Sequence, residues 1–303
     1  MRFDEKTVGD VLRRWPAYGE TRPIYPSAWA VGPSCILKGY DQLPALERNV
    51  QFMKALRRCG IPVPEIIPPA GGGDYLEHGG AYFLLTSRLS GCPVVRAAQC
   101  PDGWFYAMGG ILARLHLAFQ ACEKDIACWD NSLLAEMKGW VAASFERHPC
   151  RAVPPDALSD AVSRLEGYDA ALPRQLIHRD VHLGNFLFDR GEFSGYIDFD
   201  LSQRNIRIFD LCYFMLGLLL EGSPNRLHEE RWFSALNQAL RGYDALIPLT
   251  QAERAAIPCV MQCIELLFAA FFMEQGEEPL AASAAGLYGF VKENEARILR
   301  QCP

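Results

Sequence analysis

Residues 176–200 read LIHRDVHLGNFLFDRGEFSGYIDFD, and the rest of the chain is interpreted around this stretch. Within it, two apolar or alternating runs, residues 185–188 and 193–199, flank the turn Asp189–Glu192, which contains a glycine. Alternating apolar runs on either side of a short polar turn are typical of an antiparallel β-hairpin. The stretch therefore predicts a loop that leads directly into a hairpin.

Pairing across this hairpin is expected to gather three polar side chains. We expect residue 185 to lie opposite residue 196, which places Asp198 beside the loop of residues 179–184. Asp180, Asn185 and Asp198 then converge at the open end of the hairpin. Asn185 and Asp198 carry the hard oxygen donors that suit Mg²⁺. Asp180 has no second carboxylate beside it in the loop, so it is the better candidate for a catalytic base.

The spacing of these residues makes the chemical interpretation specific. His178, Arg179 and Asp180 are followed by four residues and then Asn185, and twelve more residues separate Asn185 from Asp198. This is the spacing of the catalytic loop and metal-binding residue of protein kinases. It predicts transfer of the γ-phosphoryl group of ATP or GTP, with Mg²⁺ required, because phosphoryl transfer depends on positioning and on neutralisation of phosphate charge.

The same segment resembles the aminoglycoside phosphotransferase and choline kinase-like superfamily. The family's loop has the pattern His-x-Asp-x-His-x-x-Asn, as residues 178–185 have, and its metal-binding strand often contains Ile-Asp-Phe-Asp, as residues 197–200 do. The resemblance covers most of the chain, although its sharpest motifs lie within this segment. It implies that Asp180 is the base and that Asn185 and Asp198 are magnesium ligands.

Four more residues of this region have supporting roles in the same interpretation. Asp210, within the run Arg207–Leu211, is similar to the aspartate that buttresses the catalytic loop in the family. We expect His178 to be buried and structural, and His182 either to contact substrate or to shape the loop. Asp200 is either a second metal ligand or a cap.

An upstream pair of charged residues agrees with the resemblance. Strands are predicted at residues 29–31 and 35–38 around a tight turn, and apolar residues at three- or four-residue intervals predict a helix over residues 43–56. Lys38 resembles the strand lysine that binds the α- and β-phosphates, and Glu47 resembles its ion-pair partner on the following helix.

The resemblance also implies an α+β, bilobal protein-kinase-like fold. We expect residues 1–90 to form a small N-terminal nucleotide-binding lobe of antiparallel sheet plus one helix, with a hinge near residues 86–91. Residues 91–303 are expected to form a larger, mainly helical lobe for catalysis and substrate binding. Thr86 and Leu89 lie in the hinge, whose backbone would bind the nucleotide base.

Two features depart from the protein-kinase pattern. Residues 25–32 contain one glycine where a Gly-x-Gly-x-x-Gly loop would cover the phosphates, and Ser27 is the candidate for covering them instead. Only eleven residues separate Asp198 from Asp210, too few for the activation segment that holds a peptide. The substrate is therefore expected to be a small hydroxylated molecule and not a protein.

Composition limits the possible partners and compartment. A net charge of -6 argues against nucleic acid, since a phosphate backbone is held mainly by clustered Lys and Arg. Eleven cysteines without a CxxC pair, and an opening sequence without an apolar leader, predict reduced thiols and a cytoplasmic protein.

Two apolar stretches, residues 209–220 and 255–273, are predicted to be buried helices and not membrane spans. The first is too short to cross a bilayer, and the second carries polar residues in its middle. The C-terminal third is predicted to consist of helices separated at Pro248, Pro258 and Pro279.

The sequence leaves the substrate open between a metabolite, such as an amino alcohol, a homoserine-like compound or a sugar, and an antibiotic of the aminoglycoside type. The acidic cluster of Glu274, Glu277 and Glu278 would attract a cation or forms a solvated turn. A nucleotide-binding regulator without turnover is the competing function, kept open by the missing glycine-rich loop. A protein kinase is disfavoured by the short segment after Asp198.

Overall fold

The computed structural model describes residues 3–15, 19–127 and 130–303, and the chain divides into two compact units. The first unit comprises Met1–Pro93, Lys124–Ala127 and Gly184–Leu201, and the second comprises Val94–Glu123, Cys128–Leu183 and Ser202–Pro303. The hairpin therefore belongs to the first unit, whereas the loop that precedes it belongs to the second. The assignment of residues 1–90 and 91–303 to nucleotide and catalytic lobes stays a prediction.

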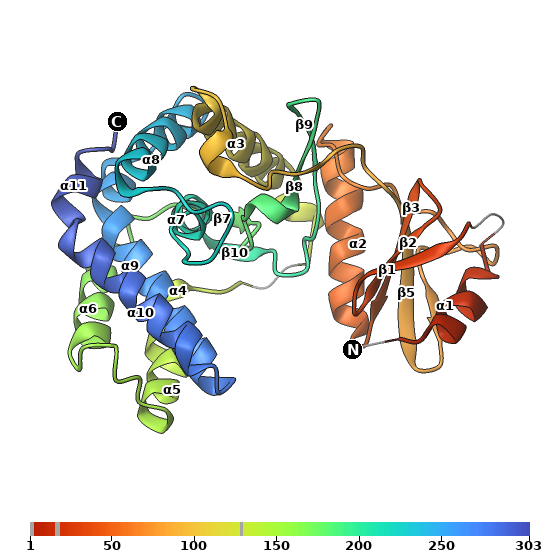
Figure 1. Cartoon of the computed structure of the whole chain (residues 1–303), viewed down its shortest axis with the longest axis horizontal. Helices are drawn as coiled ribbons and strands as arrows, with labels where there is room; N and C mark the ends of the chain where they lie inside the picture. The colour runs from red at the N-terminus through yellow and green to blue at the C-terminus, as the bar shows by residue number, and fades with distance from the viewer. Residues whose placement is uncertain (1–2, 16–18, 128–129) are drawn as a thin grey trace. The chain divides into compact units, whose positions relative to one another are not determined.

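A five-stranded antiparallel sheet with the order β1-β2-β3-β5-β4 forms the centre of the first unit. Its strands are β1 (Thr21–Tyr25), β2 (Ala28–Val31), β3 (Cys35–Tyr40), β4 (Leu76–His78) and β5 (Ala81–Ser87). Helices α1 (Glu5–Leu12) and α2 (Leu43–Arg58) lie on opposite sides of this sheet (Figure 1). The predicted strands at residues 29–31 and 35–38 and the predicted helix over residues 43–56 are confirmed.

The alternation of side chains along β3 separates the core of this unit from its polar face. Leu37 is fully buried in a cluster with Val8 and Val11 of α1. Because successive side chains of a strand point to opposite faces, Lys38 and Tyr40 point to the side of α2. A polar residue can therefore stand beside a core leucine without entering the core.

The predicted hairpin is present, with a corrected register. Strands β8 (Phe186–Asp189) and β9 (Glu192–Tyr196) pair antiparallel, and β6 (Cys92–Pro93) extends them to a sheet of order β6-β8-β9. Residue 196 pairs with residue 186, so the predicted partner, residue 185, is wrong by one. A bulge between Leu187 and Phe188 causes this shift, because it inserts one residue into the opposing strand. The strand ends at residue 196 and not at residue 199 as predicted.

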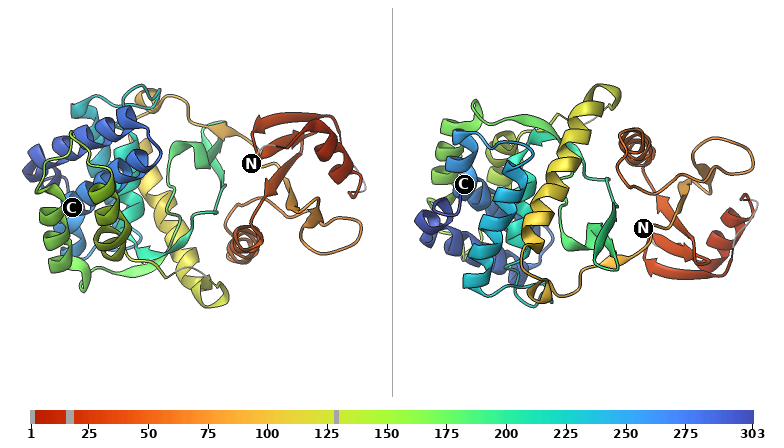
Figure 2. Two further views of the ribbon diagram at one scale, coloured as in Figure 1. Left: turned by 90° about the horizontal axis from the view of Figure 1, so that it is seen from below. Right: turned by 90° about the horizontal axis from the view of Figure 1, so that it is seen from above.

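Helices make up most of the second unit. They are α3 (Trp104–Cys122), α4 (Leu133–Glu136), a π-helical turn (Met137–Val141), α5 (Ala142–Arg147), α6 (Ala157–Asp169), α7 (Ile208–Gly217), α8 (Glu229–Asp244), α9 (Gln251–Glu274), α10 (Glu278–Glu293) and α11 (Glu295–Leu299). A two-stranded sheet of β7 (Arg174–Ile177) and β10 (Gln203–Ile206) frames the loop of residues 178–183. Figure 2 shows the helices of this unit, from the yellow α3 to the blue α9 and α10, gathered into one bundle.

Helix α9 is the central helix of this bundle. It is long and apolar enough to cross a membrane by length and composition, but 78% of its apolar window is buried. Pro258 lies inside α9, so the predicted helix break at this residue is wrong. The missing proline N–H leaves the carbonyl of Arg254 without its helical donor. The thiol of Cys302 contacts that carbonyl at 3.6 Å, which satisfies the orphaned acceptor.

Helices α3 and α8 cross with their backbones in direct contact. A Cβ atom added at Gly242 would lie 1.9 Å from the carbonyl oxygen of Tyr106, and one at Gly109 would lie 2.0 Å from that of Ala239. Only glycine at both positions permits this approach.

We expect Gly242→Ala to lower the free energy of unfolding by at least about 1–3 kcal/mol, because the added methyl group forces the two helices apart. Denaturant unfolding of the purified variant measures the change. Gly286→Ala is the matched control, since a Cβ at this position of α10 has no atom within 4 Å. Equal stability of the two variants would show that α3 and α8 do not touch as described.

Candidate active site

Lys38 is the centre of a charged cluster in the first unit. Its Nζ lies 2.5 Å from Oδ2 of Asp200 and 3.0 Å from Oδ1 of Asp198. Burial by itself would lower the pKa of Lys38, but the neighbouring Tyr40 and the two carboxylates outweigh burial and hold this pKa above its usual value. Lys38 is therefore a fixed positive charge between two aspartates.

The backbone at the end of the hairpin positions Asp198. The amide of Ile197 donates to the carbonyl of Asn185 at 3.1 Å, which joins these two residues beyond the last strand pair. Asp198 itself has a φ of 66°, in the left-handed region that non-glycine residues rarely adopt. Its side chain is 44% exposed, whereas Asn185 is buried with 5% exposure. The carboxylate of Asp198 is thus accessible to a ligand while its backbone is held.

Two residues that the sequence interpretation missed hold Asp200. The hydroxyl of Tyr40 donates to Oδ1 of Asp200 at 3.4 Å, and the amide of Asn49 donates to the Tyr40 hydroxyl at 2.6 Å. Burial raises the pKa of Asp200, against the attraction of Lys38. Two signals were present in the sequence: Tyr40 lies two positions after Lys38, on the same strand face, and Asn49 interrupts the apolar stripe of α2.

The predicted ion pair between Lys38 and Glu47 is wrong. Glu47 is exposed, and its Oε1 accepts a hydrogen bond from the Tyr75 hydroxyl at 3.4 Å. The buried face of α2 contains Leu46 and Asn49, and Glu47 points about 100° away from its neighbour Leu46 around the helix. Asp200 occupies the position beside Lys38 that Glu47 was predicted to take.

The predicted hinge residues are ordered parts of the first unit. The Thr86 hydroxyl donates to the carbonyl of Ile36 at 3.5 Å, and Leu89 packs closely against Gly195. The carbonyl of Ser27 accepts from the amide of Gly39 at 2.8 Å. Roles for Thr86, Leu89 and Ser27 in nucleotide binding stay predictions.

Asp180 is oriented by two side chains of the second unit. The Tyr213 hydroxyl donates to its Oδ1 at 2.9 Å, and Nε2 of His182 lies 3.5 Å from its Oδ2. Burial would raise the pKa of Asp180, but His182, His178 and Tyr213 together outweigh burial and lower it to about 2. Asp180 is therefore an ionised carboxylate whose orientation is set by its neighbours.

Asp210 holds the backbone of the loop of residues 178–183 in place. Its carboxylate is fully buried and accepts the amides of His178 at 2.8 Å and of Arg179 at 2.9 Å. Nε2 of His116 lies 3.0 Å from the same carboxylate, and Nδ1 of His116 lies 2.7 Å from the Tyr243 hydroxyl. His178 is itself fully buried, as the sequence led us to expect.

Arg179 completes the frame of the loop. Its guanidinium contacts both carboxylate oxygens of Glu136 at 2.9 Å and lies 4.0 Å above the ring of Phe209. Its φ of 70° is again left-handed. These contacts fix the conformation of the residue immediately before Asp180.

The predicted site residues thus fall into two sets, one in each unit. Lys38, Asp198 and Asp200 are joined in the first unit, which also contains Asn185, while Asp180, His182 and Asp210 belong to the second. The convergence of Asp180 with the metal-ligand pair would join residues of different units, and it stays a prediction.

The donor set of the first unit fits a hard divalent cation. It offers the carboxylate of Asp198 and the amide of Asn185, and Mg²⁺ takes few protein ligands and completes its shell with water and phosphate oxygens. Within the described part of the chain, no group of three or more His, Cys, Asp or Glu side chains is placed to hold a metal. This is consistent with such a sparse set.

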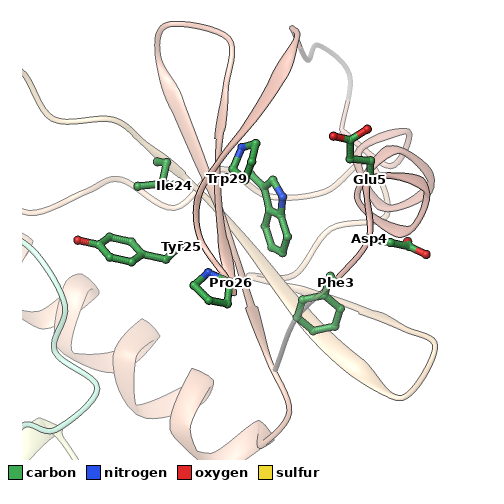
Figure 3. A pocket seen from close by; sticks show the side chains of 8 residues that line it. Phe3, Asp4, Glu5, Ile24, Tyr25, Pro26 and Trp29 are labelled. Carbon is green, nitrogen blue, oxygen red and sulfur yellow. The ribbon is translucent and has the colours of Figure 1, made fainter.

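A pocket of about 390 Å³ lies elsewhere in the first unit. Figure 3 shows the side chains that line it. Its walls include Phe3, Ile24, Tyr25 and Trp29, and none of the predicted site residues lines it. Asp4 at its rim caps α1 by accepting the amide of Thr7 at 2.7 Å. The pocket therefore belongs to the packing of the N-terminal helix and not to the charged cluster.

Comparisons with known proteins agree with this architecture. A homoserine kinase of Polaromonas naphthalenivorans (strain CJ2) is 24% identical over 237 residues, covering 74% of this chain and 68% of that protein. A homoserine kinase of Xanthobacter autotrophicus is 28% identical over 235 residues, covering 75% and 68%. The solved structure of amicoumacin kinase hAmiN in complex with AMP-PNP, Ca²⁺ and Ami has a TM-score of 0.71 at 19% identity, covering 100% of this chain and 95% of that one.

These similarities confirm the predicted α+β kinase-like fold, with its antiparallel N-terminal sheet and mainly helical remainder. The model of the phosphotransferase enzyme family matches residues 34–254, a range that includes the predicted catalytic, metal-binding and hinge residues but not Ser27. The chain belongs to the phosphotransferase enzyme family.

Proposed function

We propose that this protein transfers the γ-phosphoryl group of ATP or GTP to the hydroxyl of a small molecule. The observation that carries the proposal is the cluster of Lys38 with Asp198 and Asp200, on a chain whose catalytic loop holds an ionised Asp180. A lysine can bind the phosphates, and an exposed carboxylate oxygen can bind the metal. An oriented carboxylate can accept a hydrogen bond from the attacking hydroxyl.

Each residue then has a defined part. Lys38 would bind the α- and β-phosphates of the nucleotide, and Asn185 and Asp198 would hold Mg²⁺. A bound Mg²⁺ would neutralise charge on the phosphate oxygens. Asp180 accepts a hydrogen bond from the substrate hydroxyl and takes its proton as the oxygen attacks. With a pKa of about 2, Asp180 is a weak base, so its main contribution is orientation of the hydroxyl.

The substrate we favour is a hydroxylated metabolite, and the similarity to homoserine kinases supports this class. An antibiotic is the second candidate, supported by the fold shared with an amicoumacin kinase. We also propose a cytoplasmic location, where nucleotide is abundant and thiols stay reduced. No disulfide joins the ten cysteines within the described ranges.

Nucleotide consumption tests the proposal. The purified protein is incubated with Mg²⁺ and ATP or GTP across a panel of amino acids, amino alcohols, sugars, aminoglycosides and macrolides, with Asp180→Asn as control. Consumption stimulated by one compound with the wild-type protein alone would establish the kinase. Nucleotide binding without turnover would favour the regulator, and failure to bind nucleotide would contradict both.

A further inference from the structure

Asp200 uses both of its carboxylate oxygens within the first unit. Its Oδ2 lies 2.5 Å from Nζ of Lys38, and its Oδ1 accepts a hydrogen bond from the Tyr40 hydroxyl at 3.4 Å. The side-chain hydrogen bonds and ion pairs of Asp198 within the described residues involve only its Oδ1, 3.0 Å from the same Nζ. The Asp198 side chain is also the more exposed, at 44% against 28% for Asp200. The two aspartates therefore differ in how far the chain itself occupies them.

Tyr40 has a fixed place beside Lys38. It lies two positions further along β3, so both side chains point to the same face of the sheet. Nζ of Lys38 lies 5.2 Å from the centroid of the Tyr40 ring, within the range of a cation–π contact. Tyr40 thus contacts the lysine through its ring and the carboxylate partner of the lysine through its hydroxyl.

Asn49 connects this tyrosine to α2. Its Nδ2 donates to the Tyr40 hydroxyl at 2.6 Å, and the residue is buried on the inner face of the helix. A buried amide costs free energy unless it is hydrogen-bonded, and this donation explains a polar residue among apolar ones. Because Asn49 is the donor, the one hydrogen of the phenol is left for Asp200. The hydrogen bonds therefore run from α2 through Tyr40 to Asp200.

An aromatic contact holds α2 beside the same segment. The ring of Phe52 stacks on that of Phe199, with centroids 6.3 Å apart and 15° between the ring planes. Both rings are fully buried, and Phe199 lies between the two aspartates in the sequence. Residues three apart share one face of a helix, so Asn49 and Phe52 both act on residues 198–200, the first through Tyr40 and the second directly.

We propose that Asp200 is a positioning residue for Lys38 and not a metal ligand. Tyr40 and Asn49 hold Asp200 in this role. The inference rests on the function proposed above and concerns the same phosphate site. Asp200 keeps Lys38 in place when Asp198 holds a metal, so the phosphates of a nucleotide meet an ordered ammonium group. Helix α2 takes part through a neutral amide in place of the expected carboxylate.

Nucleotide affinity tests the role of Asp200 without requiring the substrate. A fluorescent ATP analogue is titrated into each variant with and without Mg²⁺, and the ratio of the two Kd values gives the affinity gained from the cation. Asp200→Asn is expected to keep this ratio within about threefold of wild type, because a carboxylate that does not touch the cation acts on it only through a solvent-screened charge. Asp198→Asn is the comparison, since it is expected to lose most of the ratio.

Tyr40→Phe tests the hydroxyl and keeps the ring and every charge. It is expected to weaken nucleotide binding about 3- to 10-fold, equally with and without Mg²⁺, because Asp200 loses a hydrogen bond and orders Lys38 less well. In the Asp200→Asn background the same change is expected to have almost no effect, since the hydroxyl acts through the carboxylate. Tyr75→Phe is the matched control: its hydroxyl also donates to a carboxylate of α2 at 3.4 Å, and the variant is expected to bind nucleotide as wild type does.

Asn49→Leu tests the connection to α2. The change removes the donor to the Tyr40 hydroxyl and keeps a side chain of similar size. It is expected to weaken nucleotide binding in the same direction as Tyr40→Phe, and to have no further effect when Tyr40 is already replaced by phenylalanine.

The outcomes separate this inference from the proposed function. A Mg²⁺ ratio that Asp200→Asn retains, together with a Tyr40→Phe effect that disappears in Asp200→Asn, would support it. Loss of the ratio in Asp200→Asn would make Asp200 a metal ligand and overturn the inference while the kinase stands. A Tyr40→Phe protein that binds nucleotide as tightly as Tyr75→Phe, or an effect that persists in Asp200→Asn, would overturn it equally. A wild type that binds no nucleotide would overturn both proposals.

Discussion

Asp180→Asn is expected to lower kcat by about 10²- to 10⁴-fold and to leave nucleotide affinity nearly unchanged. The amide cannot take the proton of the attacking hydroxyl, and it presents an N–H group where the carboxylate accepted a hydrogen bond. The hydrogen bond from Tyr213 can still reach the remaining carbonyl oxygen, so the side chain is expected to keep its place. Steady-state kinetics on the substrate found in the panel, together with nucleotide titration, measure both quantities.

Asp189→Asn provides the matched control for this variant. Asp189 is an exposed aspartate at the end of β8, nine residues after Asp180, and it has no proposed role in catalysis. We expect it to retain wild-type turnover. Normal turnover in Asp180→Asn would show that another group receives the proton.

Asp198→Asn is expected to weaken Mg²⁺-nucleotide binding at least about 100-fold and to reduce turnover as well, because a neutral amide holds a divalent cation far less strongly than a carboxylate does. The fold should persist. Lys38 keeps its contact with Asp200, and asparagine tolerates the left-handed backbone of this position. Titration of a fluorescent nucleotide with and without Mg²⁺ measures the effect.

The same titration contains its own control. In Asp198→Asn, affinity measured without Mg²⁺ should stay close to wild type, because the change acts on the cation. Lys38→Met, which removes a proposed phosphate contact, should lose affinity in both conditions. A loss that is equal with and without Mg²⁺ in Asp198→Asn would contradict its role as a metal ligand.

Local sequence patterns predicted the elements that bear the site, because those elements are determined by short-range chemistry. The turn Asp189–Glu192 between apolar runs specifies the hairpin, and the apolar positions of residues 43–56 specify α2. The predicted register was wrong by one residue, because a bulge leaves no signal in the alternation of apolar and polar residues along these strands. A proline within a helix was likewise taken as a break, although a distant cysteine satisfies the carbonyl it leaves.

The sequence did not predict contacts between residues that lie far apart along the chain. Glu47 was chosen as the partner of Lys38 from its place nine residues later, whereas the partner in the structure, Asp200, is 162 residues away. Which carboxylate reaches Lys38 depends on how α2 is rotated, and its rotation is set by the burial of Leu46 and Asn49.

The left-handed backbone of Asp198 has a consequence for protein engineering. A non-glycine residue held at a φ of 66° is strained by about 1–3 kcal/mol, and glycine or asparagine would relieve part of that strain. A search for thermostable variants scored on folding alone would therefore enrich replacements at this position that are expected to abolish the proposed metal binding. If the proposed role of Asp198 holds, heat resistance and turnover must be selected together in this chain, because part of its instability is located in the residue proposed to hold the metal.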